Sequence, residues 1–462
     1  MRDQSASTCK ITVAPGVFAA GHLGELTQVI DVALVDAVAA ETGTVQRRVR
    51  LLPTRVVIFF VLALALFERC AYRQVWAKMI AGLGGLAVVP SAGALSRARR
   101  RVGAKPLRAL FEAVCGPVGR PGTPGAFWRG LRTVALDGAC VHVRDTAAIA
   151  ARYPKIRAAQ IAYGYPLLRL TALIECGTRA LIGAVFGPES HTEHDHARAL
   201  LGRLRAGMLL LADAGYDDWT LMREVRATGA HYLFRSTAAR TPLIMAELAD
   251  GSYLSVLGYG KLPVRIVEAW ITVTWADGTT HRQQWRLISS LLDHVAYPAA
   301  ELVTLYHQRW QIETAYASIK CTILDGRVLR SAHPEDIDQE VYALLCVYQA
   351  IIRITVDAID SRPATHPQRA SFTIAIQTAR DQVITANAIT PDTNNILIGA
   401  IGTAVLANLL PTRRPRAKAR TRKHATSKYA RNAGQFPPTA QRYTLHTEVK
   451  IMETGLTARS KT

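Results

Sequence analysis

The pattern of apolar and polar positions changes along the chain, and this separates an amino-terminal helical region from a sheet. Residues 56–67 form the most hydrophobic run and follow Pro53, a residue that favours a helix start. The run is too short to cross a bilayer, so we expect a buried helix. Further helices are expected at about 72–83 and at 91–103, where Gly103 ends the pattern.

Downstream of a turn-rich segment at 116–125, short apolar runs predict strands. The candidate strands are residues 133–136, 141–144, 167–174, 180–186 and 208–212. The last run is apolar throughout, which is typical of a strand buried on both faces. Between the last two candidates, a helix is expected to run down to Arg205.

Residues 236–285 follow another pattern, because apolar and polar residues alternate there, most clearly at 266–275. With a turn expected at 276–279, this segment predicts a β-rich region. Beyond it, helices are expected at 340–357 and at about 367–385.

Composition narrows the class of protein. A formal net charge of +21, from 56 Lys and Arg against 35 Asp and Glu, favours a polyanionic partner. A ribosome-associated or membrane-surface protein could carry the same balance. The 7 cysteines are scattered without a C-x-x-C pair, so we expect neither a disulfide framework nor a zinc ribbon, and a reducing compartment.

Candidate chemistry lies in the helical segment 306–320. On a regular α-helix Tyr306, Arg309, Glu313 and Lys320 fall within an arc of about 60°. This mixture suits a metal-assisted phosphate reaction, in which Glu313 helps to hold a divalent ion while the other three side chains bind backbone oxygens. The alternative is a solvated helix face with ion pairs.

Two aspartates follow candidate strands. Asp137 comes after 133–136, and Asp213 comes after 208–212 and is followed by Gly215. The carboxyl ends of strands are where open α/β sheets place ligands. A single aspartate after a strand is also a common turn residue. Three acids in the order Asp, Asp, Glu are therefore the stronger signal.

These residues carry a family resemblance. Asp137, Asp213 and Glu313, the last within Tyr-x2-Arg-x3-Glu-x6-Lys, resemble the catalytic triad and signature of the DDE transposases of insertion sequence family four. The resemblance covers roughly residues 126–350. It implies an α/β fold with a ribonuclease H-like catalytic core interrupted by a β-rich insertion, and a helical N-terminal domain. Strand order agrees, since three strands, a helix and the strand before Asp213 follow each other as in that core.

The resemblance implies a mechanism and its partners. We expect two Mg²⁺ ions, with Mn²⁺ as a substitute, held by Asp137, Asp213 and Glu313, with Asp137 bridging them. The implied reaction is nicking of DNA at element ends, a hairpin intermediate, and strand transfer. The partners are terminal inverted repeats and target DNA, bound by a homodimer. We expect no membrane, and a cytoplasmic, bacterial-type, nucleoid-associated location.

Further DNA contacts are expected outside the triad. Trp285 resembles the family tryptophan that stacks on an extruded base, although it can equally be a buried aromatic of the insertion. The helix 91–103 carries Arg97, Arg100 and Arg101 and can be a recognition helix or a plain surface helix.

The histidine-rich segment 191–196 invites a metal interpretation. Ser190 and Glu193 have the spacing of a capping box at the start of a helix, so we keep this segment out of the site.

These features together predict six segments. They are 1–125, a helical N-terminal DNA-binding domain; 126–235, the first half of the catalytic core; 236–285, the β-rich insertion; 286–360, the second half with the glutamate helix; 361–410, a helical C-terminal region; and 411–462, a basic disordered tail.

Two other functions stay open. One is a catalytically inactive, transposase-derived DNA-binding regulator. The other is a carboxylate-pair glycoside hydrolase, against which the positive charge and the cations beside Glu313 argue.

Overall fold

The computed structural model describes residues 22–46, 48, 51–83, 89–158, 161–237, 239–274, 280–385, 398–411 and 446–452. The chain divides into two compact units. One, the helical unit, comprises Met1–Gly119, Val141–Pro154 and Ala315–Pro411. The other, the sheet unit, comprises Arg120–Cys140, Lys155–Thr314 and Thr412–Thr462. The predicted division into six segments stays a prediction.

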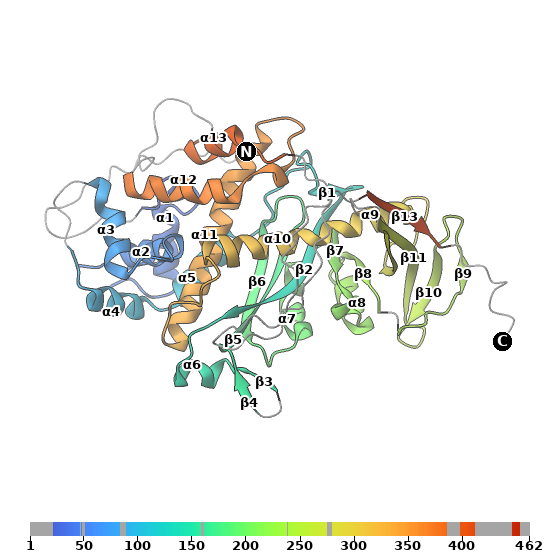
Figure 1. The fold of residues 1–462 in the computed structure, drawn as a ribbon, viewed down its shortest axis with the longest axis horizontal. Coiled ribbons are helices and arrows are strands. Elements are labelled where there is room, and N and C mark those ends of the chain that lie inside the picture. The colour runs from blue at the N-terminus through green and yellow to red at the C-terminus, as the bar shows by residue number, and fades with distance from the viewer. Residues whose placement is uncertain are drawn as a thin grey trace. The chain divides into compact units, whose positions relative to one another are not determined.

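The helical unit is built from apolar helices around a long central one (Figure 1). Its helices are α1 Val32–Glu41, α2 Thr54–Leu66, α3 Tyr72–Ile80, α4 Ala92–Val102, α5 Lys105–Val114, α6 Ala147–Arg152, α11 Pro334–Asp360, α12 Phe372–Thr385 and α13 Ala400–Ala407. α11 packs against α2, α5 and α13. The expected helices at 56–67, 72–83, 91–103, 340–357 and 367–385 are confirmed.

Two helices of this unit are very apolar. In α2 every residue except Arg55 is buried, as expected for a core helix. α11 is long and apolar enough to cross a membrane by length and composition, but 83% of its most apolar window is buried inside the protein. Burial of that extent is typical of a core helix.

Among the described residues the sheet unit contains a mixed sheet of 11 strands. Nine of them follow the order β6-β5-β2-β7-β8-β12-β11-β10-β9, and the other two are β1, which pairs with β2, and β13, which pairs with β11. The strands are β1 Phe127–Trp128, β2 Leu131–His142, β5 Leu167–Glu175, β6 Leu181–Pro188, β7 Met208–Ala212, β8 His231–Arg235, β9 Ala246–Glu247, β10 Tyr253–Leu257, β11 Leu262–Thr274, β12 Thr280–Ser289 and β13 His446–Ile451. β3 Ile156–Ala158 and β4 Ile161–Tyr163 form a separate hairpin. The helices are α7 Glu193–Leu200, α8 Trp219–Ala227, α9 Ala299–Tyr306 and α10 Gln311–Ala317.

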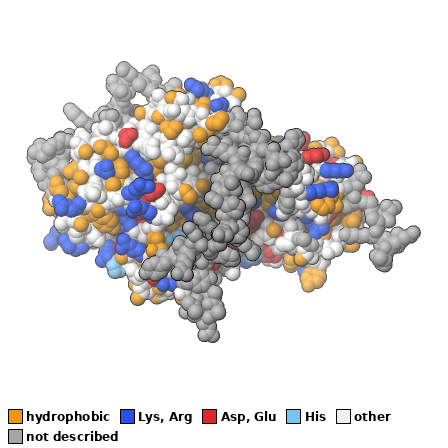
Figure 2. Space-filling model, in the orientation of Figure 1, with side chains coloured by type: hydrophobic (Ala, Val, Ile, Leu, Met, Phe, Trp, Pro, Cys, Tyr) orange, Lys and Arg blue, Asp and Glu red, His pale blue; other side chains and the backbone are white. Residues whose placement is uncertain are grey.

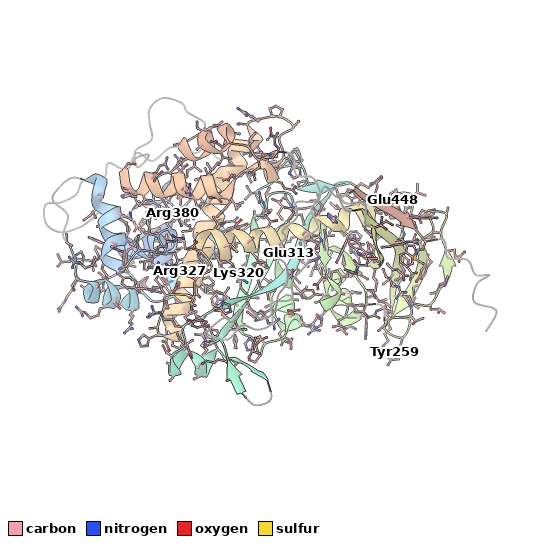
Figure 3. All side chains as sticks on the ribbon, in the orientation of Figure 1. Tyr259, Glu313, Lys320, Arg327, Arg380 and Glu448 are labelled. Atoms are coloured by element: carbon pink, nitrogen blue, oxygen red, sulfur yellow. The ribbon has the colours of Figure 1, made fainter. Side chains whose placement is uncertain are left out.

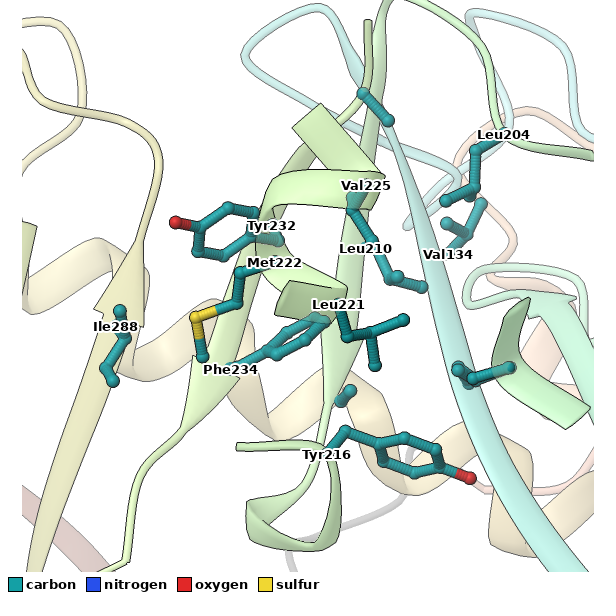
Figure 4. Packing of buried hydrophobic residues seen from close by; sticks show 14 of the residues in the cluster. Val134, Leu204, Leu210, Tyr216, Leu221, Met222, Val225, Tyr232, Phe234 and Ile288 are labelled. Atoms are coloured by element: carbon teal, nitrogen blue, oxygen red, sulfur yellow. The ribbon is translucent and has the colours of Figure 1, made fainter. Parts of the chain in front are cut away.

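The core of the sheet unit explains why the central strands are so apolar. All five residues of β7 are buried, and Met208, Leu210 and Ala212 contribute to a cluster that also receives side chains from α8 and β8. Leu210, Leu221 and Phe234 meet in this cluster, and Tyr216 lies at its edge (Figure 4). Burial on both faces is what the continuous apolar run predicted.

Parallel pairing of β2 with β7 sets the position of both aspartates. The paired residues run from Arg132 opposite Met208 to Ala135 opposite Leu211. Asp137 and Asp213 each stand two residues beyond the last pair, so the same register places them opposite each other. The sheet therefore carries both acids on neighbouring strands, with Asp137 inside β2 and Asp213 directly after the end of β7.

One expectation about β2 was wrong. The strand does not end at Asp137 but continues to His142, since β5 still flanks it on the other side. The Asp-Gly pair therefore lies within a strand and not in a turn.

The β-rich segment is confirmed as a hairpin of β11 and β12, paired from Arg265 opposite Ser289 to Thr274 opposite Thr280. The turn predicted at 276–279 lies outside the described residues. So does most of the basic tail, but its described part forms β13, which pairs with β11. For residues 446–451 the prediction of a disordered tail was wrong.

Candidate active site

The segment that carries Glu313 is not one regular helix. α9 ends at Tyr306, a 3-10 turn follows at His307–Trp310, α10 occupies Gln311–Ala317, and a π-helix occupies Ser318–Ile323. The predicted 60° arc assumed 3.6 residues per turn throughout, and that assumption was wrong. Figure 3 labels Glu313 on α10.

Arg309 stands between two of the three acids. Its Nη1 lies 3.2 Å from Asp137 Oδ2, and its Nη2 lies 3.6 Å from Glu313 Oε1. The guanidinium is only 10% exposed, and limited access to water strengthens both attractions. Its Nε is buried without a hydrogen-bond partner. One cation thus joins the acid of β2 to the acid of α10.

Asp213 is fixed from two directions. Its own carboxylate accepts a hydrogen bond from the Gly215 amide at 2.9 Å, at the start of a short 3-10 turn. The residue before it, Ala212, accepts a hydrogen bond from the Tyr306 hydroxyl at 3.1 Å. Tyr306 is 2% exposed, so its hydroxyl is used inside the fold. The predicted contact of Tyr306 with DNA backbone oxygens is therefore corrected to a role in positioning the second aspartate.

The three acids influence one another electrostatically. Burial raises the pKa of Asp137 to about 6, helped by the charges of Asp213 and Glu313 and opposed by Arg309. For Arg309, burial disfavours the charged form, but Tyr306 and the three carboxylates outweigh it and raise its pKa. The structure therefore places the buried Arg309 cation between Asp137 and Glu313, with Asp213 following the strand next to that of Asp137.

Sequence comparisons place this geometry in a family. The model "Insertion element 4 transposase N-terminal" matches residues 20–112, and the model "Transposase DDE domain" matches residues 128–350. Together they account for more than half of the chain, and the second spans all three acids. The chain belongs to the IS4 family of DDE transposases.

The chain is similar to two curated transposases and, at a low level, to one solved structure. The transposase InsG of insertion sequence element IS4 from Escherichia coli K12 is 26% identical over 420 residues, covering 88% of this chain and 93% of InsG. The putative transposase InsZ of the same organism is 28% identical over 143 residues, covering 30% of this chain and 48% of InsZ. A synaptic complex of piggyBac transposase with hairpin DNA matches with a TM-score of 0.40 and 12% identity, covering 86% of this chain and 85% of that one.

Membership of the family implies dependence on divalent metal ions. Among the described residues no three Asp, Glu, His or Cys side chains stand close enough to hold an ion, and Arg309 lies between Asp137 and Glu313. The donor set nevertheless fits, since carboxylate oxygens are the ligands that hard divalent cations prefer. The absence of a side chain at Gly215 also lets carboxylate oxygens of Asp213 and Glu193 approach within 3.0 and 3.3 Å of the place that a Cβ would occupy.

Trp285 is a packing residue of this transposase. It is 8% exposed, and its ring meets Tyr306 edge-on at 5.4 Å and stacks against His307 at 6.5 Å. Arg235 lies over the ring at 5.3 Å. With the ring so covered, the predicted stacking on an extruded base is corrected to the buried aromatic.

The arginines of α4 do not all face solvent. Arg97, Arg100 and Arg101 are exposed, which keeps them as candidate DNA contacts. Arg100 also pairs with Asp336, at 3.3 Å. Arg99 between them is 2% exposed and donates to several groups inside the helical unit. In the sequence, Arg99 cannot be told apart from the exposed arginines beside it.

Lys320 lies in the π-helix of the helical unit and is half-buried (Figure 3). Burial lowers the pKa of His142, and the positive charge of Lys320 lowers it further. Its predicted role at the DNA end stays a prediction.

A fourth acid reaches the site, and sequence reasoning missed it. The reciprocal capping bonds of α7 join Thr192 and Asp195, not Ser190 and Glu193. The predicted pair was therefore wrong by two residues, and the Glu193 carboxylate faces Gly138 and Gly215 instead. Only the position of α7 beside β5 and β6 could have indicated this.

Proposed function

We propose that this transposase cleaves DNA strands at the ends of an insertion sequence and joins the freed 3′ ends to target DNA, in a ribonuclease H-like core. Asp137, Asp213 and Glu313 are the proposed catalytic acids. A hairpin intermediate, a homodimer on DNA, and a cytoplasmic, nucleoid-associated location belong to the same proposal.

One observation carries the proposal. Asp137 of β2 and Glu313 of α10 flank the buried Arg309 guanidinium at 3.2 Å and 3.6 Å, and Asp213 follows β7, the strand paired with β2. Three carboxylates at the edge of a sheet repel one another, and the raised pKa of Asp137 reports that repulsion together with burial. A site that keeps such a cluster is suited to receive further positive charge.

Each side chain of the site has a separate proposed role. Asp137, Asp213 and Glu313 would hold two Mg²⁺ or Mn²⁺ ions, which activate the attacking water or 3′-hydroxyl and stabilise charge on the leaving oxygen. Tyr306 keeps Asp213 in place through Ala212. Arg309, whose buried Nε lacks an acceptor, would turn its guanidinium from the carboxylates to an oxygen of the scissile phosphate.

Basic surfaces would supply the affinity for DNA. Figure 2 shows Lys and Arg side chains gathered over the part of the helical unit in which Figure 1 labels α4 and α5. The exposed Arg97, Arg100 and Arg101 of α4 would contact terminal-repeat DNA, and Lys320 would engage the element end. The basic residues of 412–445 would add affinity that is independent of sequence.

The test uses the full-length protein and a linear duplex that carries the DNA flanking its gene on both sides. Asp137→Asn, Asp213→Asn and Glu313→Gln should each reduce metal-dependent nicking at least roughly a hundredfold while leaving duplex binding intact. Glu301→Gln is the matched control, since Glu301 lies on α9 and pairs with Arg129 at 2.6 Å on the surface. Wild-type nicking by any of the three variants would remove that residue from the site.

The intact acids also weigh against the regulator alternative. A non-catalytic protein would bind the same duplex without nicking it, whatever the metal, and the three variants would then behave like wild type.

A further inference from the structure

Glu193 is placed against the backbone of both aspartates. Its Oε1 lies 3.7 Å from the position that a Cβ would have on Gly138, next to Asp137. Its Oε2 lies 3.3 Å from the corresponding position on Gly215, and Asp213 Oδ1 lies 3.0 Å from that same point. A Cβ at position 215 would therefore crowd both carboxylates, whereas one at position 138 would make ordinary van der Waals contact with Glu193.

The Glu193 carboxylate is available because it takes no part in capping its own helix. Thr192 and Asp195 exchange the capping bonds of α7, which leaves Glu193 at the first helical position. Arg169 of β5 donates from Nη1 to Glu193 Oε1 at 2.5 Å, and its Nη2 lies 3.9 Å from Glu189. Arg169 thus holds Glu193 in place as Arg309 holds Asp137.

A second and independent observation concerns the Tyr216 hydroxyl. Tyr216 is fully buried, and its hydroxyl has no hydrogen-bond partner. A buried hydroxyl in that condition is unfavourable, because it has lost its water without gaining a partner. In Figure 4 the hydroxyl points away from the labelled apolar side chains. The Tyr216 ring meets the ring of His194, the residue after Glu193 on α7, edge-on at 6.0 Å. After burial, the charges of Asp137, Glu193 and Asp213 raise the pKa of Tyr216 further.

A hydrated ion bound between the acids would give this hydroxyl a hydrogen-bond partner. Mg²⁺ gives up its water reluctantly and usually keeps several water molecules when protein carboxylates bind it. Those waters need acceptors and donors at fixed positions. Glu193 provides an acceptor beside Gly138 and Gly215, and Tyr216, whose ring packs against the next residue of α7, provides a hydroxyl.

We propose that Glu193 and the Tyr216 hydroxyl form a positioning rim, which hydrogen-bonds the water shell of the divalent ion held by Asp137 and Asp213. The inference rests on the proposed function. Arg169 already engages Glu193 Oε1, so we assign the carboxylate to water and not to the ion itself. Groups of this kind contribute about 10–100-fold to metal affinity.

The experiment measures Mn²⁺ binding to the full-length, DNA-free protein by electron paramagnetic resonance of the free ion. Four variants are compared with wild type: Glu193→Gln, Tyr216→Phe, Asp137→Asn and Glu189→Gln. Glu189→Gln is the matched control, since it also removes a carboxylate near Arg169, 3.9 Å away, but Glu189 is not among the closest neighbours of either glycine. Melting temperatures in EDTA report the stability of each variant.

Glu193→Gln and Tyr216→Phe should each weaken Mn²⁺ binding about tenfold, while Glu189→Gln binds like wild type. Tyr216→Phe should melt no lower than wild type in EDTA, because it removes a hydroxyl that has no partner. Unchanged Mn²⁺ affinity in Glu193→Gln or Tyr216→Phe, or an equal loss of Mn²⁺ affinity in Glu189→Gln, would contradict the proposed positioning rim. If Asp137→Asn bound Mn²⁺ like wild type, the proposed function would fail instead.

Discussion

Replacing Asp137 with Asn should stabilise the metal-free protein at neutral pH, although it should abolish DNA cleavage. Asp137 lies beside Asp213 and Glu313, and burial together with these charges raises its pKa to about 6. The folded state therefore binds a proton more tightly than the unfolded chain does. Stability supplied by that proton is present at low pH and is lost as the pH rises to about 6 and above.

The size of the effect follows from the pKa. The difference between about 6 and the ordinary 3.8, at 1.36 kcal/mol for each pH unit, amounts to about 3 kcal/mol. Asn resembles the protonated acid and has no charge to lose. Asp137→Asn should therefore match wild type below pH 4 and exceed it by up to about 3 kcal/mol above pH 7.

Calorimetric melting in EDTA between pH 4 and pH 8 measures this difference. For a domain of about 150–250 residues, 3 kcal/mol corresponds to roughly 6–12 °C in melting temperature. Asp195→Asn serves as a control of opposite sign, since hydrogen bonds from Thr192 lower the pKa of Asp195. That variant should lose stability relative to wild type as the pH rises. An Asp137→Asn gain that is absent, or equal at pH 4 and pH 8, would refute the electrostatic reasoning.

Three further outcomes are expected. Arg99→Ala removes a guanidinium that is 2% exposed and should lower the free energy of unfolding in urea by about 3–5 kcal/mol. Arg100→Ala should lower it by less than about 1 kcal/mol, and equal losses would contradict the burial argument. Tyr306→Phe removes the bond to Ala212 and should slow nicking without weakening DNA binding, and weaker binding with normal nicking in gel-shift and cleavage assays would restore the DNA contact. Replacing the basic residues of 412–445 with glutamine should make the affinity for duplex DNA less dependent on salt. The slope of log affinity against log salt concentration should become shallower by about 0.9 for each lost phosphate contact, and an unchanged slope would show that this segment does not bind DNA.

The sequence was informative where one local pattern had one solution. The apolar run of β7 could only be buried, so Asp213 had to leave the sheet at its end. The apolar run of α2 likewise had to lie in a core. Local patterns are reliable in such cases because burial of a continuous apolar segment leaves few alternatives.

Prediction failed where two local solutions were equally good. Ser190 with Glu193 and Thr192 with Asp195 both have the spacing of a capping box, and only the end of β6 decides between them. The wrong choice concealed Glu193 from the site.

Other failures came from long-range contacts. Asp137 followed by glycine was taken for a strand end, but β5 still flanks β2 there, and the strand continues. Arg99 cannot be told from its neighbours in the sequence, because its burial depends on Gln339 and Ser331 more than two hundred residues away. Regular helix geometry failed at His307–Trp310, where the chain tightens into a 3-10 turn.

The most direct test of the account is to soak crystals of the protein in MnCl₂ and to record the anomalous scattering of manganese. The account predicts a peak at the carboxylates of Asp137 and Asp213, with Arg309 no longer paired to Asp137 as it is at 3.2 Å in the metal-free protein. Manganese bound elsewhere, with Arg309 still spanning Asp137 and Glu313, would contradict it.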